Sequence, residues 1–88
     1  MHKASAYQAL VQELELWRTM PRSELVAKVG APASVRYASI DGEDIAVEVA
    51  LHWHDKDRTA IRVVGVANGP SHWRLDRLEE SVIISLVS

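Results

Sequence analysis

Two histidines on either side of a tryptophan form the motif best suited to chemistry in this chain. His52 and His54 are two residues apart, a spacing that puts both imidazole rings on the same face of a strand. Their nitrogens suit zinc, and a third ligand would have to come from Asp55, Asp57 or His72. No spacing selects that third ligand, so we expect no metal and no other cofactor. We interpret the pair as polar residues on the wet face near a turn; the alternative is an edge that changes charge near neutral pH.

Three charged residues on neighbouring predicted strands form a second candidate group. If both hairpins of the sheet have three-residue loops, Arg36 lies directly opposite Glu48, and Arg62 is a diagonal neighbour of Glu48. We interpret the group as a solvated ladder of ion pairs. The alternative is a surface that binds anions or carboxylates through the arginine side chains. A glutamate between two arginines stays ionised, which argues against a role for Glu48 as a general acid.

Trp73, within the segment Gly-Pro-Ser-His-Trp-Arg, is the aromatic side chain that we expect to be exposed in a loop. Loops on rigid scaffolds often carry recognition, and Trp and Arg are common at the centres of interfaces. The alternative is that the indole folds back and closes the open end of the core. The complete candidate binding surface comprises Arg36, Glu48, His52, His54, Arg62 and Trp73.

Signatures of catalysis are missing. The chain has no cysteine, which excludes a thiol nucleophile and disulfides. No serine lies in a Gly-x-Ser-x-Gly elbow, and the four glycines form neither a phosphate-binding loop nor a dinucleotide fingerprint. The sequence therefore predicts a protein that is not an enzyme.

Length and composition indicate one small domain over residues 1–88. Hydrophobic residues make up 48% of the chain and charged residues 25%, which is ordinary for a folded protein. The net charge of −2, with no run of Lys or Arg, argues against non-specific binding of nucleic acid. The sequence has no signal-peptide-like start and no apolar stretch of about 18 residues, so we expect a cytoplasmic protein without a membrane partner.

The elements that must position these residues follow from one alternating stretch, Ile45 to Trp53. Large apolar residues alternate strictly there with small, charged or polar ones, which indicates a half-buried strand. The turn at 55–57 joins it to the next strand, and a three-residue loop sets Leu51 against Ile61. A register shifted by one residue would mix the two faces, whereas a shift by two would keep them and stays open.

An Asp-Gly pair within residues 41–43 predicts a hairpin between this strand and the preceding one. A two-residue loop would put Val35 and Tyr37 on the charged face of the sheet. A three-residue loop instead sets Tyr37 against Val47 and Val35 against Val49. The second arrangement keeps both faces consistent, so we expect it.

Together these patterns predict an α+β fold, with two helices packed on a curved antiparallel sheet of four to five strands that could close into a small barrel. Ser5 and Gln8 have the spacing of a helix capping box, and the run from Val82 to Val87 is apolar on both faces, as in a strand buried on both sides. Such a strand is expected in the sheet centre, closing a barrel, or against another subunit. The helices are expected at about 6–19 and 21–29, and the strands at about 33–40, 44–54, 58–67 and 81–87. The inward stripe of the first helix comprises Tyr7, Leu10, Val11, Leu14 and Trp17.

Two short motifs lie at particular places in this outline: Ile40-Asp41-Gly42 puts a glycine in an early hairpin, and the apolar segment 81–85 forms the last strand. In this arrangement the chain resembles the Sm-like small β-barrel proteins, which carry an early hairpin glycine and a similar last apolar strand. The family's RNA-contacting residues have no counterpart, since the turn at 55–57 lacks an asparagine and no Arg-Gly pair precedes Val82. The resemblance implies self-association through strand edges and does not by itself imply RNA binding.

The sequence thus predicts a small non-catalytic interaction module that self-associates as a homodimer or higher homo-oligomer. The apolar terminal strand and the small core favour burial against another copy. One alternative is an Sm-like module that binds single-stranded RNA through Arg36, His52, Arg62 and Trp73. Another is a small-molecule or metal-binding domain around His52 and His54.

Overall fold

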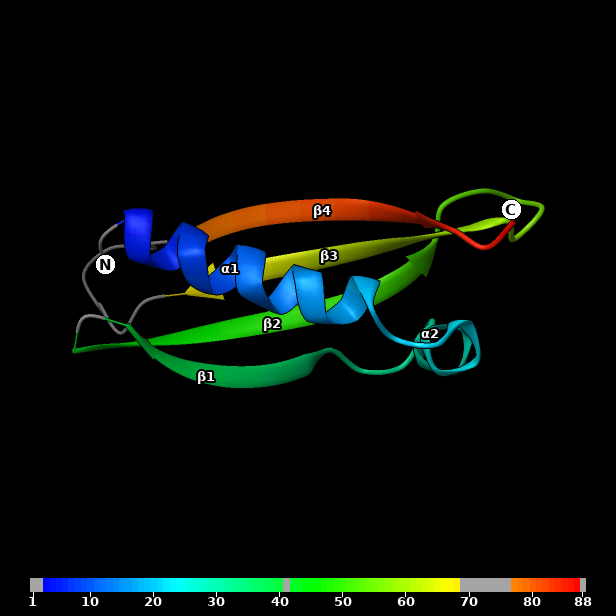
Figure 1. Cartoon of the computed structure of the whole chain (residues 1–88). Coiled ribbons are helices and arrows are strands. Elements are labelled where there is room, and N and C mark those ends of the chain that lie inside the picture. The colour runs from blue at the N-terminus through cyan, green and yellow to red at the C-terminus, as the bar shows by residue number, and fades with distance from the viewer. Residues whose placement is uncertain (1–2, 41, 69–76, 88) are drawn as a thin grey trace.

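One long helix crosses one face of a four-stranded antiparallel sheet, and a short second helix lies at one end of the sheet (Figure 1). The computed structural model describes residues 3–40, 42–68 and 77–87. The strands follow one another in the order β1-β2-β3-β4, and the sheet does not close into a barrel. The predicted α+β fold is therefore confirmed in its open form. The elements are α1 (Lys3–Arg18), α2 (Arg22–Lys28), β1 (Ser34–Ile40), β2 (Glu43–Trp53), β3 (Ala60–Asn68) and β4 (Arg77–Ser85).

Helix α1 packs on β3 at a point where the strand has no side chain. A Cβ atom at Gly65 would lie 2.7 Å from Cδ1 of Leu10 and 3.2 Å from Cδ2 of Leu14, so any side chain at this position would force these two leucine side chains to shift. The same face of α1 buries small and large apolar residues against the odd-numbered positions of β2 and β3. The core contains Ala6, Ala9, Leu10, Leu14, Trp17, Leu25, Ile45, Val47, Val49, Leu51, Ile61, Val63 and Ala67.

The inward face of α1 differs from the predicted stripe. The described helix already includes Lys3 and Ala4, so Ser5 lies inside it instead of capping it. Tyr7 is 50% exposed, and Val11 is also exposed, whereas Ala6 and Ala9 are buried. Small residues face the sheet because the helix lies close to it, and the bulkier Tyr7 and Val11 are turned toward the β4 side.

We expect Gly65→Val to lower the free energy of unfolding by about 1–3 kcal/mol, because the added branches overpack the contact with Leu10 and Leu14. Urea denaturation measures this difference. The control is Ala46→Val, which adds bulk to the half-buried opposite face of β2 and should change stability by less than about 0.5 kcal/mol. An equal loss in both variants would contradict a special role for the close approach.

The β1–β2 hairpin has a two-residue loop, and the expected three-residue loop is wrong. Ile40 pairs with Glu43, so Tyr37 faces Ala46 and Arg36 faces Val47. The one-residue difference reverses both faces of β1 and places Arg36 on the helix side. Gly42 has a φ of +77°, a backbone conformation that suits the tight turns favoured by Asp-Gly pairs.

The β2–β3 register is shifted by two residues from the three-residue-loop arrangement, which was the shift that the sequence left open. Leu51 pairs with Val63, and both faces keep the predicted residues. The loop closes where the His54 amide donates to the carbonyl of Ala60, 2.9 Å away. Arg58, not Asp57, adopts the left-handed conformation in this longer loop, with a φ of +56°.

Asp55 holds this loop together. Its carboxylate accepts hydrogen bonds from the hydroxyl of Thr59, from the Thr59 amide at 2.8 Å and from the Ala60 amide at 3.4 Å. These bonds, the one from the Thr59 hydroxyl above all, hold the pKa of Asp55 below its ordinary value of 3.8. Hydrogen bonding to the ionised carboxylate thus shapes the end of the sheet.

The lowered pKa makes a pH-dependent contribution to folding. Because the folded-state pKa is the lower one, the Asp55 carboxylate stabilises the folded chain above the ordinary value of 3.8 and loses this effect as the pH falls through the lowered value. Asp55→Asn should therefore be less stable than the unaltered chain at neutral pH, and the gap should narrow below about pH 4. Urea denaturation across a pH series measures the gap. Asp57→Asn in the same turn is the control, and an identical pH response there would rule out the assignment.

Strand β4 begins at Arg77, earlier than the expected start at residue 81, and it is an edge strand. Its even-numbered residues face α1, whereas Ile83 on the other face is 55% exposed. The prediction of a strand buried on both faces is wrong in the structure of this chain, since the strand neither lies in the sheet centre nor closes a barrel. The third expected placement, against another subunit, is taken up below.

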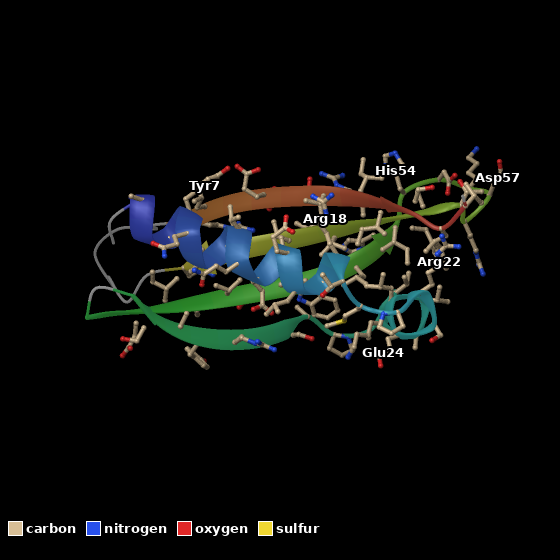
Figure 2. All side chains as sticks on the ribbon, in the orientation of Figure 1. Tyr7, Arg18, Arg22, Glu24, His54 and Asp57 are labelled. Carbon is tan, nitrogen blue, oxygen red and sulfur yellow. The ribbon has the colours of Figure 1, made fainter. Side chains whose placement is uncertain are left out.

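Helix α2 lies at one end of the sheet, where the helix and the residues after it bond to the chain after β4 and to β2. It begins after Pro21 and buries Leu25. The guanidinium of Arg22 donates to the carbonyl of Leu86, 2.7 Å away, directly after β4 (Figure 2). Gly30 donates its amide to the carbonyl of Leu51 in β2. The Arg22 bond anchors the chain that follows β4, and the Gly30 bond joins the segment after α2 to β2.

Candidate interaction surface

The face of the sheet opposite α1, here called the open face, has no layer covering it among the described residues. It carries exposed apolar side chains at both edges: Tyr37 in β1 is 77% exposed, Val35 is 49% exposed, and Ile83 in β4 completes the set. Between them, Ala46 and Val64 are half-buried, and Val66 is buried. These exposed apolar residues lie at opposite edges of the sheet and form no single contiguous patch, so the open face by itself does not indicate a partner.

The predicted ion-pair ladder is not formed in this register. Glu48 lies on the open face opposite Val35 on one side and Val66 on the other. Arg62 faces His52 directly, and no ion pair among the described residues joins Glu48 to either predicted arginine. Three of the candidate residues thus share the open face, but as separate exposed groups.

Arg36 lies on the other face and has a different partner. Its Nε atom is 3.5 Å from Oε2 of Glu13, whose side chain is only 8% exposed between α1 and the sheet. The other carboxylate oxygen accepts a hydrogen bond from Nε1 of Trp17, one helical turn along, at 3.2 Å. A buried carboxylate needs such partners, and here an indole and a guanidinium supply them.

We expect a double-mutant cycle with Glu13→Gln and Arg36→Met to give a coupling energy of about 1 kcal/mol, because the carboxylate is buried although its arginine partner is exposed. Chemical denaturation of the four proteins measures it. The control cycle uses the exposed pair Glu15 and Arg18 on α1, also 3.5 Å apart, with an expected coupling of about 0.3 kcal/mol. Equal coupling in the two cycles would contradict a buried role for Glu13.

The histidine motif is split by the structure. His52 lies within β2 on the open face, whereas His54 lies in the bend that follows the strand (Figure 2). Over residues 3–40, 42–68 and 77–87, no three His, Cys, Asp or Glu side chains gather closely enough to hold a metal ion. Trp73 and His72 lie outside the described residues.

The outer edge of β4, at one end of the strand order, is a candidate for contact with a partner. Leu86 donates its amide to the carbonyl of Thr59, 2.8 Å away. Because the bonding direction alternates along a strand, the even-numbered residues of β4 bond to β3 and the odd-numbered residues direct their N–H and C=O groups outward. Among the described strands, none pairs with the backbone groups that Ser81, Ile83 and Ser85 direct to this edge, and the stretch holds no charged residue and no proline.

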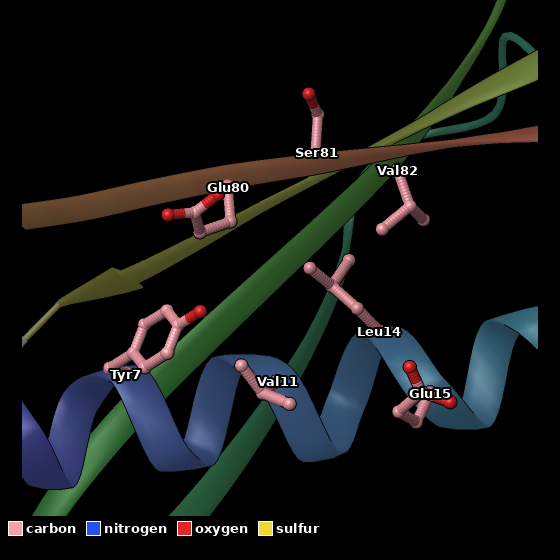
Figure 3. Close-up of a pocket in the computed structure, with 7 residues that line it drawn as sticks. All are labelled: Tyr7, Val11, Leu14, Glu15, Glu80, Ser81 and Val82. Atoms are coloured by element: carbon pink, nitrogen blue, oxygen red, sulfur yellow. The ribbon is translucent and has the colours of Figure 1, made fainter.

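A groove of about 200 Å³ runs between α1 and β4 (Figure 3). Leu14 of α1 and Val82 of β4 point toward each other, and Tyr7 and Glu80 line the groove toward the N-terminal end of α1. Val82 belongs to a row of half-buried side chains that pack on the core from its outer side. The row comprises Leu78, Val82, Ile84 and Leu86. The core is thus incompletely covered along β4.

Sequence reasoning missed Tyr37, Val35 and Ile83 as surface residues. The signal for the first two was present, because an Asp-Gly pair favours a two-residue hairpin loop. The assumption that alternating apolar residues face the core outweighed it. For Ile83, the uninterrupted apolar run suggested burial, and nothing in the sequence indicated an edge position.

Comparison with protein-family models, with curated proteins and with solved structures finds no match to this chain. In the part of the chain that the structure describes, neither helix has the length and hydrophobicity needed to cross a lipid bilayer. The surfaces described above therefore carry the functional argument by themselves.

Proposed function

We propose that this protein is a small non-catalytic interaction module that self-associates through the β4 side of its sheet. The observation that carries the proposal is the uncharged free edge from Ser81 to Ser85, which has an exposed isoleucine at its middle. Edge strands of natural proteins are usually protected by charges, prolines or bulges, because unpaired backbone groups attract other strands. Residues 81–85 of this edge contain neither a charged residue nor a proline.

The state of the core supports the same side. Val82 and Ile84 pack on the core but stay half-exposed at its margin, and Tyr7 and Val11 on α1 border the same margin. A second protein surface placed there would remove apolar area from water, at about 25 cal/mol for each Å² buried. A small core gains most from such burial.

The RNA-binding alternative is supported less well. Arg36, one of its proposed contacts, is engaged by Glu13 on the helix side of the sheet. On the open face Arg62 shares the surface with Glu48 and Glu79, so the charge there is mixed. Single-stranded nucleic acid favours a continuous positive groove with stacked aromatic rings.

Sedimentation analysis over the micromolar range tests the proposal, with an expected monomer–dimer equilibrium or a higher oligomer. Ile83→Asp should weaken association at least ~10-fold, because it places a charge at the centre of the uncharged edge, and tenfold corresponds to about 1.4 kcal/mol. Since Ile83 is half-exposed, the fold of the monomer should tolerate the change.

Tyr37→Asp is the matched control, because it adds the same charge to the open face at the opposite edge strand. It should leave association nearly unchanged. A monomer at every concentration would overturn self-association, and a larger loss from Tyr37→Asp would move the contact to the β1 side.

A further inference from the structure

We infer that two copies of this chain join their sheets by antiparallel pairing of β4 with β4, about a two-fold axis at Ile83. The inference rests on the proposed self-association and adds the occupant, the direction and the register of the contact. The result is a continuous eight-stranded sheet, with α1 of both copies on the same face. Isologous contacts of this kind are the commonest route to a dimer.

The direction of the backbone groups sets which residues can pair. Ser81, Ile83 and Ser85 direct their N–H and C=O groups to the free edge, as the bond from Leu86 to Thr59 requires. With the axis at Ile83, this residue exchanges hydrogen bonds with its own copy, and Ser81 exchanges them with Ser85. The outward groups in the uncharged stretch all gain partners.

The side chains favour the same register. With the axis at Ile83, Val82 of one copy faces Ile84 of the other on the helix side, where close pairs pack most tightly. The two Ile83 side chains meet on the open face, next to Arg62 of each copy, which faces Ile83 in the β3–β4 register. Every facing pair within residues 81–85 is uncharged.

Other registers are worse. An axis at Ser81 would set Glu79 against Ile83 and Glu80 against Val82, so that carboxylates lose water beside apolar groups. An axis nearer the C-terminal end would pair residues beyond Ser85, where the chain has left the strand and Leu86 is held by Arg22. The axis at Ile83 uses the strand and avoids its charges.

The second edge of the sheet does not offer an equivalent contact. Strand β1 has Arg36 near its middle, and antiparallel self-pairing about its centre, Tyr37, would make the two Arg36 side chains diagonal neighbours of like charge. Pro32 lies shortly before this strand, a common protection of sheet edges. A second copy at β4 also completes the groove beside α1, because its Ile84 would lie next to Val82 at the groove's outer side.

Cysteine cross-linking tests the register directly, since the chain has no cysteine of its own. Facing residues in a hydrogen-bonded antiparallel pair have Cα atoms about 5.5 Å apart, within the range of disulfides. Under mild oxidation, Ile83→Cys alone should give a covalent dimer, and a mixture of Ser81→Cys with Ser85→Cys chains should give the mixed dimer. Ser81→Cys alone should react at least ~10-fold more slowly, because its two thiols would lie four residues apart along the strand, about 13 Å.

The outcomes separate the register from the proposed function. A dimer in sedimentation analysis that does not cross-link through Ile83→Cys would overturn the β4 register and leave self-association standing. Equal rates for Ser81→Cys alone and Ile83→Cys would also overturn it, as would preferential cross-linking by the control Tyr37→Cys in β1. A monomer at all concentrations would overturn both proposals.

Discussion

The close contact between α1 and β3 at Gly65 sets how the long helix packs on the sheet. The absent side chain lets Leu10 and Leu14 settle directly on the strand, and small residues such as Ala6 and Ala9 follow along the helix. Helix α1, packed this close to β3, covers one face of the sheet. The opposite face and the outer margin at β4 stay open to solvent, because no further element is available among the described residues to cover them.

The partners of the buried Glu13 carboxylate depend on the tight β1–β2 turn. The turn sets the face of β1, so Arg36 points to the helix side and reaches Glu13, while Trp17 donates to the same carboxylate. No buried side-chain nitrogen or oxygen among the described residues lacks a hydrogen-bond partner. The same turn puts Tyr37 on the open face, so one local geometry accounts for a polar contact inside and an aromatic group outside.

The alternation from Ile45 to Trp53 was sufficient to predict this strand and its inward residues, since period-two patterning follows directly from strand geometry, and the helical spacing near the N-terminus added the α+β class. Leu51 and Ile61 point inward as predicted although the β2–β3 register differs by two residues, because a shift by two keeps each side chain on its face. The one-residue difference in the β1–β2 register instead reversed the predicted faces of β1. The predicted register therefore placed Arg36, Glu48 and Arg62 in one group, whereas the register in the structure puts Arg36 on the opposite face from the other two.

What the sequence by itself determined was the set of elements and, for β2 and β3, which side chains point inward, because both depend on local periodicity. Only the tertiary structure decided that β4 is an edge, that Ile83 is exposed, and that Glu13 is buried with partners. The order of the strands, the length of the β1–β2 turn and the distance of α1 from the sheet set these features, and each depends on contacts between residues far apart in the chain. The same run from Val82 to Val87 would fit a central or an edge strand, and its neighbours in space determine which one it becomes.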